Sequence, residues 1–256
     1  MGELSLPKYE GTGAVLYSAV FGGYDSVLKA SSSDSIDSFI LFTDDEDLVV
    51  EGWKVIYVRG TNLSSKTLNR MYKMQPHIYI PNASSTIYID GNVGFENNAF
   101  EPLISYFEKN HFDVMTMAHF SRHCIYDETE VLLRSPRVKP FILLKEIISY
   151  YRAGFRKQCA MGENNLIIRT NYGAQKTGDI WWEKYASGSG RDQLSLPVVI
   201  WETNVEHTAY PFNIRNLNYF KYKLHNVISD RNIVKSVIRY LFLVVPFKMV
   251  RKLLSF

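Results

Sequence analysis

Short apolar runs alternate with polar stretches through the first half of the chain. The runs are Ala14–Val20, Ser38–Thr43, Trp53–Val58 and Thr86–Ile89, and most of them end in glycine or acidic residues. Runs of four to eight apolar or β-branched residues bounded by turn-forming residues are typical of buried strands. The pattern therefore predicts four strands here, with a helix over about Ser65–Ile80 between the third and the fourth.

The second half continues this alternation. We expect further strands over Phe112–Met117, Asn164–Arg169 and Pro197–Glu202, and a helix over Arg137–Ala153 that begins near Pro140. Strands that alternate with helices indicate an α/β fold with a mixed, largely parallel sheet flanked by helices. Ligands of such sheets bind beyond the carboxyl ends of the strands, so the polar residues at these ends are candidates for a binding site.

Composition favours one domain with a sizeable core. The chain has 256 residues, 46% of them apolar, and no Pro-rich or Gly/Ser-rich run divides it. We place the domain at residues 1–225 and a separate tail at 226–256. Two cysteines, Cys124 and Cys159, form no disulfide framework, and the first residues carry no apolar signal segment. We therefore expect a cytoplasmic protein, peripheral at the inner face of a membrane.

Basic charge is concentrated in the tail. Residues 230–256 hold six basic residues and one acidic residue, a net charge of +5, whereas the whole chain carries +3. Arg231, Lys235 and Arg239 are spaced four residues apart among apolar positions, a pattern typical of helices that lie on anionic membranes. The alternative is a C-terminal helix that packs on the domain. Because the rest of the chain lacks this excess, we expect no nucleic-acid partner.

The strongest local signal is Asp90-Gly91-Asn92, which follows the apolar strand Thr86–Ile89 directly. A carboxylate, a glycine spacer and a second oxygen ligand suit a hard divalent cation that also binds diphosphate oxygens. The alternative is an ordinary Asp-Gly turn. A basic stripe precedes this strand: Arg70, Lys73 and His77 are spaced along one face of the predicted helix, although Pro76 should kink it. The stripe could neutralise a diphosphate or form a solvated helix face.

Two later segments carry candidate site residues. His119 and Arg122 follow a predicted strand and could bind acceptor hydroxyls or phosphate, or close a loop. Asp192 and Gln193 follow a Gly/Ser-rich loop at the expected start of a short helix. Asp192 could act as a base or positioning group for an acceptor hydroxyl, or cap the helix. His207 is a further candidate ligand for metal or phosphate.

Several of these segments together resemble the TOD1/MUCI70 glycosyltransferase-like domain family. The matching pieces run in order from about residue 14 to residue 205: Tyr17-Ser-Ala-Val-Phe-Gly-Gly-Tyr-Asp25, Phe42-Thr-Asp44 with Trp53-Lys-Val55, Lys73-Met-Gln-Pro-His77, Tyr88-Ile-Asp-Gly-Asn92 and Arg191-Asp-Gln-Leu194. The resemblance implies a GT-A-like, Rossmann-like fold. Plant members of the family are associated with cell-wall polysaccharides, and bacterial members look like surface-polysaccharide transferases.

The resemblance also implies roles for individual residues. It makes Phe21, Gly22, Tyr24, Asp25 and Thr43 parts of the nucleotide-sugar site, which the residues Arg70, Lys73, His77, Asp90, Gly91 and Asn92 would complete. Asp90 and Asn92, with His207, become the counterparts of the metal ligands for Mn²⁺ or Mg²⁺. Asp192 becomes the late acidic residue near the acceptor, and we expect it to be catalytic. By their places in the sequence, His119, Arg122 and Gln193 are expected on the acceptor or phosphate side.

The expected function is transfer of a sugar from a nucleoside diphosphate sugar, a UDP sugar above others, to a glycan or lipid-linked glycan acceptor in surface polysaccharide synthesis. Two alternatives remain: a lipid-amide hydrolase of the ceramide type, and a non-catalytic nucleotide- or glycan-binding module. The sequence contains neither a Gly-X-Ser-X-Gly elbow nor a His-Glu-X-X-His motif, which speaks against the hydrolase.

Overall fold

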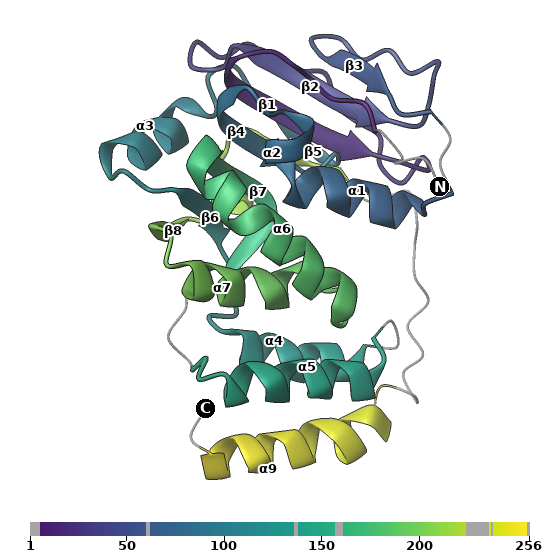
Figure 1. Ribbon diagram of the computed structural model, residues 1–256, viewed down its shortest axis with the longest axis vertical. Coiled ribbons are helices and arrows are strands. Elements are labelled where there is room, and N and C mark those ends of the chain that lie inside the picture. Colours follow the sequence, from purple (N-terminus) through teal and green to yellow (C-terminus); the bar gives the residue numbers. More distant parts are fainter. Residues whose placement is uncertain are drawn as a thin grey trace.

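The computed structural model describes residues 6–59, 62–135, 138–156, 161–223, 236 and 238–254. A seven-stranded sheet forms the centre of the protein, with the strand order β3-β2-β1-β4-β7-β6-β8 (Figure 1). Its strands are β1 (Gly13–Val20), β2 (Ser38–Thr43), β3 (Lys54–Tyr57), β4 (Ala83–Ile89), β6 (Val114–Ala118), β7 (Gly162–Thr170) and β8 (His207–Tyr210).

The sheet is mixed but largely parallel. β1 pairs in parallel with β2 and β4, β2 with β3, and β6 with β8, whereas β7 runs antiparallel to both of its neighbours. The carboxyl ends of every strand except β7 therefore meet at one edge. This arrangement confirms the predicted fold class and brings the residues after β1, β4 and β6 to the same edge of the sheet.

Four helices cover one face: α1 (Ser65–Met74), α2 (Pro76–Tyr79), α6 (Asn171–Ser187) and α7 (Asp192–Thr203) (Figure 1). Their apolar side chains pack on the sheet around Tyr72 and Trp181, which are fully buried. Arg169 of β7 lies in the same core. Its guanidinium donates to the Tyr17 hydroxyl at 2.8 Å and to the carbonyl oxygen of Lys73 at 2.7 Å, which fixes the end of α1 against the sheet.

The opposite face is covered by α3 (Glu101–Lys109) and by a two-stranded sheet of β5 (Val93–Phe95) and β9 (Phe220–Tyr222). Phe100, Leu103 and Phe107 pack against the central strands in a second core. A short 3-10 turn, η1 (Ile214–Asn216), leads into β9.

A further helical layer lies beyond α7 (Figure 1). It consists of α4 (Ile125–Arg134), α5 (Pro140–Arg152), the π-helical segment η2 (Tyr240–Val244) and α9 (Val245–Leu254), which share a third apolar core. Arg251 of α9 pairs with Asp127 at 2.6 Å and Glu130 at 2.7 Å, both on α4. The C-terminal helix is thus present, and one of its faces packs on the domain.

Two sequence expectations are wrong in detail. Pro197–Glu202 is not a strand but the interior of α7, in which Pro197 is accommodated. Because α7 is buried along most of its length, its apolar run has no helical period to distinguish it from a buried strand. The helix expected over Ser65–Ile80 is interrupted at Gln75, and Pro76 begins the separate turn α2.

The tail is described only in part. Arg231 and Lys235, two of its predicted basic positions, lie outside the described residues, as do Cys159 and the boundary at 225/226, which stays a prediction. Within the described segments, each helix is too short or too polar to cross a bilayer.

Candidate active site

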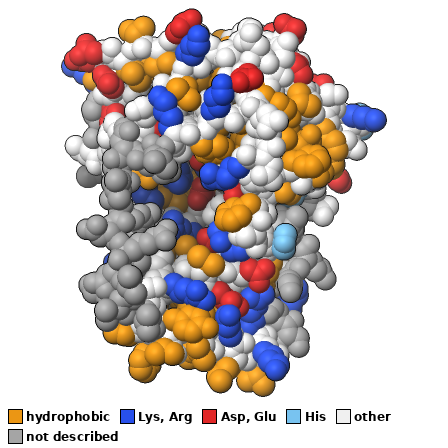
Figure 2. Space-filling view, turned by 180° about the vertical axis from the view of Figure 1, so that it is seen from behind, with side chains coloured by type: hydrophobic (Ala, Val, Ile, Leu, Met, Phe, Trp, Pro, Cys, Tyr) orange, Lys and Arg blue, Asp and Glu red, His pale blue; other side chains and the backbone are white. Residues whose placement is uncertain are grey.

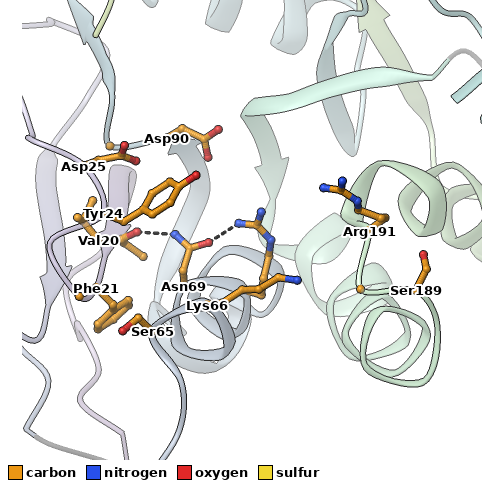
Figure 3. Close-up of a pocket in the computed structure, with 15 residues that line it drawn as sticks. Val20, Phe21, Tyr24, Asp25, Ser65, Lys66, Asn69, Asp90, Ser189 and Arg191 are labelled. Atoms are coloured by element: carbon orange, nitrogen blue, oxygen red, sulfur yellow. Dashed lines mark hydrogen bonds between the residues drawn. The ribbon is translucent and has the colours of Figure 1, made fainter. Parts of the chain in front are cut away.

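A cavity of about 470 Å³ opens at the carboxyl edge of the sheet. Three segments line it: the loop after β1, the first two turns of α1, and the loop between α6 and α7, with Asp90 and Gly91 at the end of β4 (Figure 3). Of the predicted nucleotide-sugar residues, those that line it are Phe21, Gly22, Tyr24, Asp25, Arg70, Asp90 and Gly91.

Glycine is required where the loop after β1 meets the start of α1. Gly22 has φ of +63°, and a Cβ atom there would lie 2.5 Å from the Ser65 hydroxyl oxygen. The backbone N–H of Gly22 donates to both carboxylate oxygens of Asp44, at 2.9 and 3.1 Å. The acidic residue that follows β2 therefore anchors the loop, and the close approach keeps one wall of the cavity free of side chains.

Gly91 is needed for the same reason on the other wall. A Cβ atom at this position would lie 2.3 Å from Cγ2 of Val20, so only glycine lets β4 turn beside the end of β1. The turn presents the Asp90 carboxylate to the cavity. The Tyr88 hydroxyl donates to Oδ1 of Asp90 at 2.9 Å and holds that carboxylate in place.

Three cations face the cavity: Lys66, Arg70 and Arg191. They crowd one another, since burial and the charges of Arg70 and Arg191 lower the pKa of Lys66. Because these three cations repel one another, binding of an anion between them would be favourable. The first turn of α1, capped by Ser64, lies at the same cavity, and its backbone dipole also favours negative charge.

An ion cluster lies beside these cations. Lys73, only 2% exposed, places Nζ 3.1 Å from Oδ2 of Asp192 and 3.5 Å from Oδ1 of Asp90. Nε of Arg70 lies 3.7 Å from the same Asp192 oxygen. Burial alone would raise the pKa of Asp192, but Arg70 and Lys73 hold it well below its usual range. The cluster thus contains two cations and two carboxylates.

Asp192 is the first residue of α7, but it does not cap the helix. The N-cap is Arg191, and no side chain accepts a capping hydrogen bond there. The carboxylate turns instead toward α1 and the end of β4. The alternative of a simple helix cap is therefore excluded.

A second cavity, of about 300 Å³, shares Arg70 and Asp90 with the first. It brings together the predicted residues Lys73, His119, Arg122, Asp192 and Gln193. Other polar residues complete its lining, namely Glu163, Asn164, Asn165 and Arg215, together with the ring of Phe120. Two cavities that meet at one ion cluster can hold two substrates side by side.

His119 is positioned to hold its loop in shape. Its Nδ1 accepts hydrogen bonds from the backbone N–H groups of Ser121 and Arg122, both at 3.1 Å. Burial and the charge of Arg122 lower the pKa of His119 to about 4, so the ring is neutral at pH 7. Arg122 is itself held by an ion pair with Glu128 of α4. These contacts favour a loop-closing role for His119 over proton transfer.

Four predicted residues do not line either cavity: Thr43, His77, Asn92 and His207. Oγ1 of Thr43 accepts from the backbone N–H of Asp45. His77, moved away by the break at Pro76, pairs with Asp179 at 3.2 Å. Asn92 is buried and donates to the carbonyl oxygen of Lys223 at 3.0 Å, which joins the turn after β4 to the chain beyond β9.

His207 lies far along the sheet from Asp90. It is level with Val114 of β6, which is level with Arg169 of β7 and in turn with Thr86 of β4. His207 is therefore three strands away from β4 and four residues below the level of Asp90. The structure does not bring it together with Asp90 and Asn92, and the predicted metal triad does not form.

The residues present fit a cation only in part. In the described segments, no three His, Cys, Asp or Glu side chains are grouped as metal ligands. Asp25 and Asp90 are the carboxylates among the residues that line the first cavity. Asp25 lies beside the turn, because a Cβ atom on Gly91 would be 3.4 Å from the Asp25 Cβ. A Mg²⁺-type site, which uses one or two carboxylates and completes its shell with water and phosphate oxygens, fits this set.

Sequence reasoning missed part of the lining. Lys66, Asn69 and Arg191 face the first cavity. The basic stripe of α1 is Lys66, Arg70 and Lys73, one turn earlier than expected, and the predicted break at Pro76 was the signal for this shift. Asn164 and Asn165 were interpreted only as the start of a strand, and Glu163 was not assigned, although three consecutive polar residues in a buried strand also require polar partners.

The fold is α/β, and the paired cavities at the carboxyl edge of its sheet are consistent with a glycosyltransferase-like protein, the class that the family model assigns. The family model for the TOD1/MUCI70, glycosyltransferase-like domain matches residues 6–229, and the chain belongs to this family. Among solved structures, mouse xyloside xylosyltransferase 1 in its apo form is similar at 10% identity and a TM-score of 0.44, covering 78% of this chain and 85% of that one. No curated protein matches the sequence.

Proposed function

We propose that this protein transfers a glycosyl group from a nucleoside diphosphate sugar, a UDP sugar above others, to a glycan or lipid-linked glycan acceptor in surface polysaccharide synthesis. One observation carries the proposal: a cation-lined cavity and a polar cavity meet at Arg70 and Asp90. Family membership supports glycosyl transfer in general.

The first cavity suits the donor. The ring of Tyr24, 45% exposed and directed into the cavity, can stack on the base (Figure 3). Stacking on an aromatic ring contributes about 1 to 3 kcal/mol per base. Lys66, Arg70 and Arg191 offer charge-assisted hydrogen bonds to the diphosphate, whose binding also relieves their mutual repulsion. The sugar would then lie near Asp90, at the entrance to the second cavity.

A divalent cation, Mn²⁺ or Mg²⁺, fits between the diphosphate and the end of β4. We assign its protein ligands to Asp90 and Asp25 rather than to Asn92 and His207, because only the two aspartates line the cavity. When bound, the cation would offset the charge that develops on the leaving diphosphate.

The second cavity suits a hydroxyl-bearing acceptor. Asn164 and Asn165 offer amide groups, and Phe120, on the loop that precedes α4, offers an apolar ring face to a sugar. Oδ1 of Asn165 and Nδ2 of Asn164 are buried and lack partners within the described structure, which is costly unless a ligand satisfies them. In this arrangement Asp192 accepts a hydrogen bond from the acceptor hydroxyl and orients it toward the donor.

A thermal-shift screen of nucleoside diphosphates and their sugars, with and without Mn²⁺, tests the proposal. A ligand at about 100 times its Kd stabilises a protein by about 2.7 kcal/mol, and raises Tm by roughly 5–10 °C for a chain of this size. We expect one nucleotide to give this shift, and Asp25→Asn to reduce its Mn²⁺-dependent part while Asp47→Asn, at an exposed position outside both cavities, does not. If no nucleotide shifts Tm, the donor site is refuted.

Turnover separates an enzyme from a binding module. Release of the nucleoside diphosphate from the sugar identified in the screen, with glycan acceptors added, should be measurable in the wild type. Asp192→Asn should bind the nucleotide and lose this release. Binding without release for every acceptor class would favour a non-catalytic module.

A further inference from the structure

The C-terminal helical segment is apolar on two opposite faces. One face, with Val244 and Phe247, is buried against α4 and α5. The other carries five exposed apolar side chains, among which Phe242 is 73% and Leu253 is 82% exposed; they are Leu241, Phe242, Met249, Val250 and Leu253. We call these five the α9 face. Packing on the domain requires only the first stripe, so the second indicates another apolar partner.

The exposed charges of this helical layer have one sign. In residues 123–135, 138–156, 236 and 238–254, the described parts of α4, α5, η2, α9 and the loops beside them, every exposed Lys, Arg, Asp or Glu is basic. These residues are Arg134, Lys139, Lys145, Arg152, Arg156, Lys248 and Lys252. Of the acidic residues of the same layer, Glu128 and Glu146 are buried, and the partly exposed Asp127 and Glu130 are each paired with Arg251. The space-filling view shows hydrophobic and basic side chains together at this end of the molecule (Figure 2).

We propose that the α9 face, with its basic surround, lies in the plane of an anionic membrane. Apolar side chains at the boundary of the acyl chains with a rim of Lys and Arg at the headgroups are the two components of such binding. A second copy of the chain fits less well, because a two-fold contact would place the same basic rims against each other.

This placement also positions the second cavity. α9 packs on the first turn of α4, where Arg251 reaches Asp127 and lies 3.7 Å from Sγ of Cys124. The loop immediately before this turn carries His119, Phe120 and Arg122 of the second cavity. A membrane at the α9 face would therefore be separated from the second cavity by α9 and α4. The second cavity is where we propose that a lipid-linked acceptor binds. Membrane binding itself does not depend on the proposed transfer reaction.

Cosedimentation of the whole chain with vesicles tests the proposal. We expect the protein to bind vesicles of phosphatidylcholine with phosphatidylglycerol, to leave them at high salt, and not to bind phosphatidylcholine alone. The double variant Phe242→Ser with Leu253→Ser should bind at least about tenfold more weakly. Lys252→Glu changes two units of charge, each equivalent to about fivefold, and should weaken binding about 25-fold.

Val49→Ser is the matched control. Val49 is also apolar and is 90% exposed, but it lies between β2 and β3, at the opposite end of the molecule, so this variant should bind as the wild type does (Figure 1). Every substituted side chain is exposed, and far-UV circular dichroism and Tm should confirm intact folds. The proposal fails if the wild type ignores anionic vesicles or if the double variant binds them normally. It also fails if sedimentation velocity reveals a dimer that the same variant dissociates. Retained nucleotide binding in all variants separates this outcome from that of the donor screen.

Discussion

Replacing Asp192 by asparagine removes the carboxylate on which the ion cluster depends. Asparagine keeps the size of the side chain but not its charge. Arg70 and Lys73 then lose their partner at 3.7 and 3.1 Å, and Lys73 keeps only Asp90 at 3.5 Å. The cluster changes from two cations and two carboxylates to two cations and one.

The cost follows from the burial of these groups. Removing one partner of a buried ion pair typically destabilises a protein by about 3 to 5 kcal/mol, because the remaining charge is left without compensation. The side chain of Asp192 is 14% exposed and that of Lys73 is 2% exposed, so solvent screens little. Since Asp90 continues to compensate Lys73, we expect Asp192→Asn to lower the free energy of unfolding by about 3 kcal/mol, the lower end of that range.

The effect should depend on pH in one direction. The pKa of Asp192 is lower in the folded than in the unfolded protein. Its contribution to stability is therefore complete above the unfolded value, near 4, and is lost as pH falls below it, by about 1.4 kcal/mol per pH unit. The gap between wild type and variant should be constant from pH 7 to pH 5 and narrow below pH 4.

Urea unfolding monitored by tryptophan fluorescence at several pH values measures this gap. Asp179→Asn is the control, because Asp179 also pairs with a basic side chain but is 61% exposed, and such pairs contribute about 0 to 1 kcal/mol. Equal stability of wild type and Asp192→Asn at pH 7 would refute the ion cluster. A gap that persists unchanged at pH 3 would refute the low pKa.

Three other substitutions test separate parts of the structure. Asp90→Ala should leave the fold intact and weaken Mn²⁺-dependent binding of UDP at least about tenfold in calorimetry, since one of two proposed carboxylate ligands is removed; unchanged affinity would remove Asp90 from the metal site. Arg169→Met removes three buried hydrogen bonds, in which the guanidinium donates to the Tyr17 hydroxyl and to the carbonyl oxygens of Lys73 and Met74, and should lower the free energy of unfolding in urea by about 3 kcal/mol; a loss below 1 kcal/mol would contradict this. Burial lowers the pKa of His207 to about 4, so the stability that the neutral imidazole contributes above pH 6.5 is lost as pH falls toward 4. In thermal unfolding, His207→Asn should therefore lose less stability than the wild type between pH 6.5 and pH 4. Equal losses in the two proteins would contradict the burial of this imidazole.

Strand positions followed from the sequence, whereas some helix features did not. β1, β2 and β4 were predicted within a few residues because short apolar runs ended in glycine or aspartate at each strand end. α7 was interpreted in part as a strand because a helix buried on nearly all sides shows no amphipathic period. The spacing of apolar residues indicates whether a segment is buried on one face or on all sides, but it does not distinguish a helix from a strand when all sides are buried. The elements that enclose α7 are β7, α6 and α4, and they come together only in the folded chain.

The site was predicted by order along the chain better than by chemistry at each residue. The loop after β1 and the turn after β4 converge because parallel strands share a carboxyl edge, and α6, which follows the antiparallel β7, returns the chain to that edge before Asp192. The metal ligands could not be assigned correctly from the sequence, because the spacing of residues along the chain does not give the distances between them in the folded protein. Asn92 follows Asp90 by two residues yet binds Lys223, while Asp25, separated by sixty-five residues, lies beside Gly91.

Charge balance links the donor to Asp192. The cluster of Arg70, Lys73, Asp90 and Asp192 is neutral as a set, so the charge of a diphosphate must be compensated by Lys66, Arg191 and a divalent cation. When phosphate oxygens draw the guanidinium of Arg70, Asp192 shares less positive charge and its pKa rises. The carboxylate then becomes a stronger acceptor for the proton of an acceptor hydroxyl. We therefore expect donor binding to precede activation of the acceptor, because Arg70 and Lys73 cannot fully neutralise the diphosphate and the Asp192 carboxylate at the same time.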